Sequence, residues 1–92
     1  MKQTPAVVFG GEKPIIEQVA DEIRSARANW PELYNAHEGY AVLLEEVDEL
    51  KAHVWTKQTN RDLNAMRKEA IQVAAIAIRF AEEVCSEARG RR

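Results

Sequence analysis

The chain has little cysteine and no long hydrophobic run. Cys85 is alone among 92 residues, which excludes an intramolecular disulfide and a zinc site built from several cysteines. Near the start, the apolar run AVVF at residues 6–9 is too short for a signal-peptide core and far too short to span a bilayer. These absences predict a soluble, cytoplasmic protein in a reducing compartment, with no membrane partner.

A basic stripe is also missing. The formal net charge is -2, and lysine and arginine are dispersed apart from RGRR at residues 89–92. Nucleic acid is therefore not an expected partner. The basic tail at 89–92 is either a frayed, solvated end or a contact for anions.

What the sequence does contain is apolar residues at helical spacing in three segments. The segments begin after Pro14, near Ala36 and near Asp62, and they end before Asn29, near Trp55 and close to Gly90. Asn35 is a suitable cap for the second helix, and either Asn60 or Asp62 for the third. The pattern predicts an all-α, single domain over residues 1–92, an antiparallel bundle of three main helices with residues 1–13 as an extended N-terminal arm.

The apolar residues also predict how the helices pack. In the second helix they share one face that we expect to point inward: Tyr40, Leu43, Leu44, Val47, Leu50 and Val54. The third helix is apolar almost all round at residues 70–78, which predicts a central position. Since so small a chain cannot bury both helices on several sides, we expect a homo-oligomer of four-helix type.

The second helix also concentrates negative charge. Its acids are Glu38, Glu45, Glu46, Asp48 and Glu49. Like charges four residues apart, such as Glu45 and Glu49, repel each other. Two explanations remain open: a solvated acidic face screened by salt, or carboxylates that bind a hard cation such as Mg²⁺. Glu46 and Glu49, three residues apart, can reach one ion.

A polar seam interrupts the apolar third helix. Glu69 and Gln72 enter it three residues apart, and Arg79 and Glu83 continue the same stripe. Buried ionisable groups cost several kcal/mol unless they are paired or bind metal. We therefore expect this seam to have partners, with the acidic side of the second helix as the candidate.

These two segments resemble a known family. EEVDEL at residues 45–50 is similar to the E-E-x-x-E-L segment of the MazG-like all-α nucleotide pyrophosphohydrolases, which include the dimeric dUTPases. KEAIQVAAIAIRF at residues 68–80 lies where that family has E-x-x-D on its next helix. The resemblance covers roughly residues 14–88 and is nearest to small MazG-like proteins common in phage and mobile-element gene sets.

The resemblance implies a homodimer or dimer of dimers in which four helices form each site. It implies Mg²⁺ held by carboxylates and hydrolysis of an NTP or dNTP to a monophosphate and pyrophosphate, a house-cleaning activity on the nucleotide pool. Glu46 and Glu49 match the metal ligands and, with the adjoining Glu45, the catalytic acids. Glu69 matches the first residue of E-x-x-D. Gln72 departs from the family because it is neutral where a carboxylate is found.

The departure at Gln72 leaves a second interpretation open. An amide oxygen can coordinate a hard cation but contributes no negative charge, so metal affinity should fall. Glu45 or Glu38 can compensate, and Glu38 is included among the substrate-binding candidates. The alternative is a catalytically weak helical module that binds a nucleotide or a protein.

A triphosphate substrate requires positive charge and a surface for its base. Arg79 is the first candidate for the phosphates, with Lys68 after it, although a salt bridge from Arg79 to Glu83 or Glu82 is an alternative use. Trp30, in the connection between the first two helices, is the candidate for stacking on the base.

Overall fold

The computed structural model describes residues 13–90 and is helical, with no strand in that range. Its elements in chain order are α1 (Ile15–Asn29), α2 (Ala36–Val54), η2 (Gln58–Asn60), α3 (Leu63–Arg79), η3 (Phe80–Val84) and η4 (Glu87–Arg89). The prediction of an all-α fold with three main packed helices is confirmed. Most of the predicted N-terminal arm, and residues 91–92 of the basic tail, lie outside the described residues.

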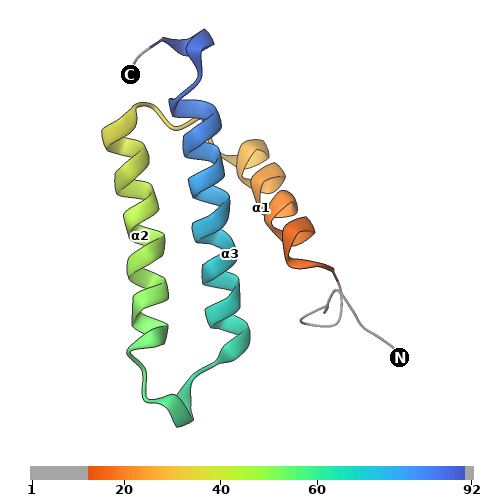
Figure 1. Cartoon of the computed structure of the whole chain (residues 1–92), viewed down its shortest axis with the longest axis vertical. Helices are drawn as coiled ribbons and strands as arrows, with labels where there is room; N and C mark the ends of the chain where they lie inside the picture. Colours follow the sequence, from red (N-terminus) through yellow and green to blue (C-terminus); the bar gives the residue numbers. More distant parts are fainter. Residues whose placement is uncertain (1–12, 91–92) are drawn as a thin grey trace.

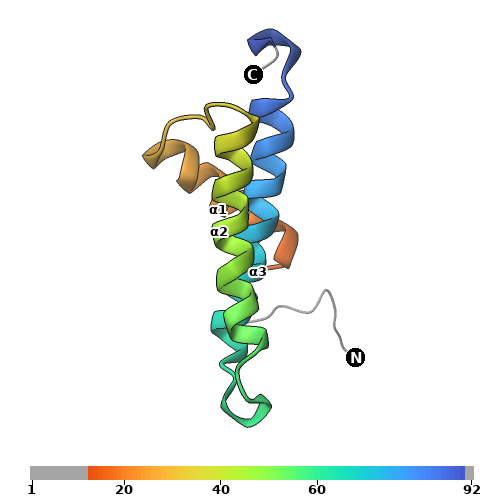
Figure 2. The same ribbon diagram turned by 90° about the vertical axis from the view of Figure 1, so that its left-hand side faces the viewer.

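Helix α3 is central, as its sequence predicts. It runs antiparallel to α2, and α1 crosses it obliquely on the side away from α2 (Figures 1 and 2). The largest buried cluster joins α1 to α3 and consists of Val19, Ile71 and Ala75, with Ile15, Ile23 and Ala74 packed against it. Because this core is small, the positions of α1 and α2 also depend on polar contacts. Within residues 13–90 no helix has the length and apolarity needed to cross a membrane.

Local signals set the helix boundaries. Pro14 precedes the first residue of α1, and α1 ends just before Trp30 and Pro31. The Asn35 side chain accepts a hydrogen bond from the Glu38 amide at 2.8 Å, and Asp62 caps α3 in the same way. Both caps satisfy amides that lack a partner within the helix, so the prediction for Asn35 is confirmed, and of the two candidates Asn60 and Asp62 it is Asp62 that caps α3.

The predicted inward face of α2 is wrong in part. Tyr40, Leu44 and Val47 remain 59%, 41% and 37% exposed. Gly39 is buried and Val42, Leu43 and Glu46 are half-buried, so the contact face lies to one side of the predicted one, where α2 approaches the end of α3 at Gly39. A Cβ atom there would lie only 2.8 Å from the Phe80 ring. On this side of α2 Glu46 is half-buried, whereas Glu45 and Glu49 beside it are exposed.

The C-terminal end is less regular than predicted. After Arg79 the helical hydrogen bonding widens into the π-turn of η3, and the helical path breaks before the short η4. Arg89, at the start of the predicted basic tail, donates hydrogen bonds to the carbonyls of Leu33 and Tyr34 at 2.8 and 3.1 Å. Arg89 is therefore bound to the connection between α1 and α2 and does not belong to a frayed end.

Candidate functional site

Three carboxylates from two helices converge where α2 faces α3. Glu46 and Glu49 lie three residues apart on α2, and Glu69 lies on α3. One carboxylate oxygen from each residue lies within 4.8 Å of the other two. The i,i+3 spacing places the first two on one side of their helix, and the antiparallel pairing brings the third opposite them. We call these three residues the acidic cluster.

The acidic cluster lacks compensating contacts. Glu46 Oε1 and Glu69 Oε1 are buried, and neither accepts a hydrogen bond from the residues that the structure describes. Burial, the neighbouring Glu69 carboxyl and the charges of Glu49 and Glu45 together raise the pKa of Glu46 to about 7. The Glu69 carboxyl also raises the pKa of Glu49. A proton or a cation at this position would relieve the repulsion.

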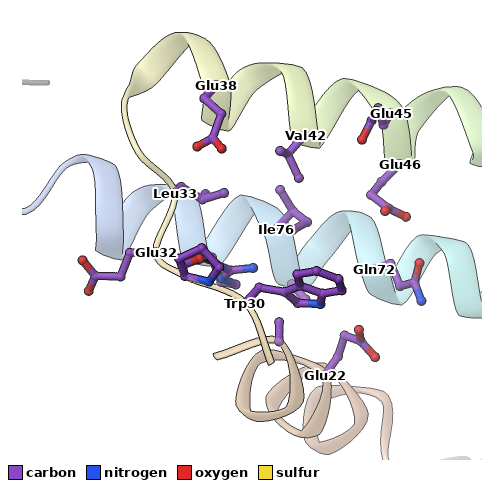
Figure 3. Close-up of a pocket in the computed structure, with 14 residues that line it drawn as sticks. Glu22, Trp30, Glu32, Leu33, Glu38, Val42, Glu45, Glu46, Gln72 and Ile76 are labelled. Carbon is purple, nitrogen blue, oxygen red and sulfur yellow. Dashed lines mark hydrogen bonds between the residues drawn. The ribbon is translucent and has the colours of Figure 1, made fainter. Parts of the chain in front are cut away.

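An open cavity of about 520 Å³ begins beside the acidic cluster and extends between the three helices. Glu46 belongs to the acidic cluster and also lines the cavity. Figure 3 shows Glu38, Glu45 and Glu46 reaching in from α2, with Gln72 on α3 and Glu22 on α1. Trp30, from the connection, lies between α1 and α3. The walls therefore combine carboxylates with apolar side chains, a composition suited to an organic ligand with bound cations.

Arg79 lines this cavity but is engaged on other partners. The side chain of Arg79 is 4% exposed, and its guanidinium donates to both carboxylate oxygens of Glu83, Nε to Oε2 at 2.9 Å and Nη2 to Oε1 at 3.1 Å. It also donates to the Pro31 carbonyl at 3.2 Å. The alternative anticipated for Arg79, a salt bridge to Glu83, is what the structure contains.

Glu83 joins this ion pair to the connection between α1 and α2. Its carboxylate also accepts hydrogen bonds from the Leu33 amide and from Arg27, both at 2.9 Å. Burial alone would raise the pKa of Glu83, but Arg79, the Leu33 amide and Arg27 outweigh burial and lower the pKa to about 2. We call Arg27, Arg79, Glu83 and Arg89 the polar clamp, because they fix the segment that positions Trp30.

The other predicted site residues are divided between the cavity and the surface. Gln72, Trp30 and Glu38 line the cavity, whereas Lys68 is exposed on α3 and lies outside the lining. Glu38 also accepts a hydrogen bond from the Tyr34 amide, so it has a structural role at the start of α2. The structure thus brings most of the candidates together but separates Lys68 from them.

Sequence reasoning missed Glu22 and the role of Glu83. Glu22 lines the cavity from α1, and its only signal in the sequence is its position beside the apolar stripe of that helix. The Glu83 carboxylate accepts a hydrogen bond from the Leu33 amide, which lies 50 residues earlier in the chain. Helical periodicity does not predict a contact between residues so far apart in the sequence.

Comparison with known proteins gives no relative for this chain: no protein-family profile, curated protein or solved structure matches it. The features of the molecule that bear on its function are therefore the acidic cluster, the cavity and the polar clamp.

Proposed function

We propose that the chain is a Mg²⁺-dependent nucleoside triphosphate pyrophosphohydrolase that acts on the cytoplasmic nucleotide pool. The observation that supports it is the convergence of Glu46, Glu49 and Glu69 beside a cavity large enough for a nucleotide, with two buried oxygens that have no hydrogen-bond donor among the described residues. Carboxylate oxygens are the ligands that Mg²⁺ prefers, so the residues present fit this cation. The resemblance to the MazG-like family supports the same reaction.

Each acid has a role in this proposal. Glu46, Glu49 and Glu69 would hold the cation, and Gln72, one turn along α3 from Glu69, would leave its neutral amide to the rest of the substrate. A bound Mg²⁺ supplies charge neutralisation at the phosphates and lowers the pKa of water. Glu45 lines the cavity next to the acidic cluster and accepts the proton of the attacking water. Water adds to the α-phosphorus, the bond to the bridging oxygen breaks, and the products are a monophosphate and pyrophosphate.

The charge of the cavity makes the cation essential to this function. Five carboxylates line it, from Glu22, Glu32, Glu38, Glu45 and Glu46, against the single guanidinium of Arg79. That guanidinium is already bound to Glu83. A triphosphate brings about four negative charges, which only cations that accompany it can balance here. We therefore assign the substrate as the magnesium complex and Arg79 as a positioning residue for the cavity wall.

The proposal includes assembly with a second copy of the chain. Tyr40, Leu44 and Val47 form an apolar stripe on α2 that the described chain leaves partly exposed. A partner helix laid on this stripe would give the four-helix arrangement implied by the family resemblance. Homodimer and dimer of dimers both satisfy this requirement.

Gln72 favours a second candidate function. A cavity with a neutral amide at this position, and with its one guanidinium engaged, suits a module that binds a nucleotide or a protein without turnover. This module would keep the fold and the acidic cluster but release no pyrophosphate.

The deciding experiment incubates the protein with each NTP and dNTP in Mg²⁺ and measures pyrophosphate and nucleoside monophosphate. We expect both products in equal amounts from at least one substrate, and a rise in melting temperature on adding Mg²⁺. Glu49→Gln should remove turnover and the Mg²⁺-dependent rise while leaving the fold intact, because it relieves repulsion within the acidic cluster.

Asp48→Asn is the matched control, since Asp48 is exposed on the same helix and lies outside the lining of the cavity. Its turnover should equal that of the unaltered chain. If no nucleotide gives product but nucleotide binding is retained, the chain is the binding module and not a pyrophosphohydrolase. Unfolding of Glu49→Gln would show that Glu49 is a structural residue and refute the site.

A further inference from the structure

Between α1, the connection and α3, the cavity contains an aromatic ring and polar side chains that make no hydrogen bond within residues 13–90. The Trp30 indole is 69% exposed although it lines the cavity. In Figure 3 the ring lies between Ile76 on α3 and Glu22 on α1, with Gln72 further along α3. An exposed indole at the edge of a cavity offers a face on which a planar group can stack.

Two polar side chains next to this ring are without partners. The Glu22 carboxylate makes no hydrogen bond or ion pair with any residue from 13 to 90, and neither does the Gln72 amide. An ionised carboxylate only accepts hydrogen bonds, whereas an amide both donates and accepts. The Trp30 ring is therefore bordered by Glu22, which can only accept hydrogen bonds, and by Gln72, which can donate or accept them.

The polar clamp holds this arrangement in place. Glu83 binds the Leu33 amide, and Arg79 binds the Pro31 carbonyl directly after Trp30. The backbone that positions the indole is thus tied to the end of α3 at Pro31 and at Leu33, which limits the ordering cost of binding a ligand against the ring.

We infer that Trp30, Glu22 and Gln72 form a nucleobase subsite that selects bases with an exocyclic amino group over uracil and thymine. This inference rests on the proposed function, since it assigns the base of a nucleotide whose phosphates face the acidic cluster through Glu46. Trp30 stacks on the base, Glu22 accepts from its amino group, and Gln72 pairs with the neighbouring ring atoms.

The base edges differ in the way that this subsite can read. Cytosine and adenine present an amino donor beside a ring-nitrogen acceptor, and guanine presents two adjacent donors that one carboxylate accepts together. Uracil and thymine present a single N–H donor between two carbonyl oxygens. A carboxylate that accepts from this N–H lies close to both oxygens, and their partial negative charge repels it. A carboxylate therefore discriminates against them, by on the order of tenfold or more for a well-formed pair.

The test measures binding of α,β-methylene analogues of dATP, dCTP, dGTP, dTTP and dUTP in Mg²⁺ by titration calorimetry, with pyrophosphate release from the natural nucleotides assayed in parallel. We expect at least one amino-bearing analogue to bind roughly tenfold or more tightly than the dTTP and dUTP analogues. Glu22→Gln should reduce this ratio to about twofold, since an amide also donates to a carbonyl. Trp30→Ala should weaken all five, and Trp30→Phe should restore part of the loss.

Glu17→Gln is the control, because Glu17 is exposed on α1 and lies outside the lining of the cavity. Equal binding of the five analogues, tighter binding of the dTTP or dUTP analogue, or a ratio unchanged by Glu22→Gln would overturn the subsite even if pyrophosphate is released. The expected ratio without pyrophosphate release would support the subsite and refute the enzyme. No binding by any analogue would overturn the subsite, and no release in the same experiment would overturn the proposed function as well.

Discussion

Replacing Glu83 by glutamine tests the polar clamp. Glu83 is 3% exposed and accepts hydrogen bonds from Arg79, Arg27 and the Leu33 amide. Its pKa falls on folding from an ordinary value of 4.5 to about 2. At about 1.4 kcal/mol for each tenfold change in proton affinity, this corresponds to roughly 3 kcal/mol of stability at neutral pH. A glutamine side chain keeps the shape but leaves the buried Arg79 guanidinium without its counter-charge.

The expected loss is large for a chain of this size. Domains of this length have a free energy of unfolding of about 5–14 kcal/mol, so roughly 3 kcal/mol is a substantial share. Urea unfolding followed by circular dichroism at pH 7 measures it. Glu82→Gln is the control, because Glu82 pairs with Arg27 on the surface at 2.7 Å and should cost less than about 1 kcal/mol.

The dependence on pH gives a second measurement on the same variant. Because folding lowers the pKa of Glu83, its stabilisation is complete above pH 4.5 and is lost as the pH falls toward 2. Glu83→Gln should lack this component of acid unfolding. A loss below about 1 kcal/mol at pH 7, or an unchanged acid profile, would refute the assignment of the clamp as a main stabilising contact.

Two further predictions concern the contact between α2 and α3. Folding raises the pKa of Glu46 to about 7, so the protein in EDTA should lose stability as the pH rises from about 4.5 to 7. Glu46→Gln should flatten this part of the curve of melting temperature against pH. A curve that the substitution leaves unchanged would contradict the burial of that carboxyl. Gly39→Ala should destabilise the chain by about 1–2 kcal/mol in urea unfolding, although alanine has the better helix propensity, because the new Cβ would lie 2.8 Å from the Phe80 ring and 3.3 Å from Val84. The loss should be smaller in a Phe80→Leu background. A gain in stability would show that the Phe80 ring moves aside freely.

The helices and their caps could be predicted because their determinants are local. Asn35 and Asp62 cap the amides three residues after them, and Pro31 disfavours helix at the residue before it. The inward face of α2 could not be predicted from hydrophobicity alone. Its orientation depends on the contact of Gly39 with Phe80, which lie far apart in the sequence.

The candidate site divides in the same way. The meeting of Glu46, Glu49 and Glu69 could be expected because two helical spacings and one antiparallel pairing are sufficient to produce it. The partners of Arg79 could be anticipated only as an alternative, since the spacing to Glu83 permits an ion pair but does not require one. Glu22 was missed because the crossing of α1 over α3 is set by packing, which the chain's local pattern does not encode.

The polar clamp has a consequence for how the molecule can be divided. Glu83 and Arg89, which tie down the segment after Trp30, come after every residue of the acidic cluster in the chain. A version ending at residue 82 would retain all three converging carboxylates but lose the contacts of Glu83 and Arg89 with Leu33, so that only the Arg79 contact with the Pro31 carbonyl would remain beside the indole. If the proposed function holds, cation binding and nucleobase binding should therefore be separable by truncation, since the residues proposed for the cation precede Glu83 and Arg89 in the chain.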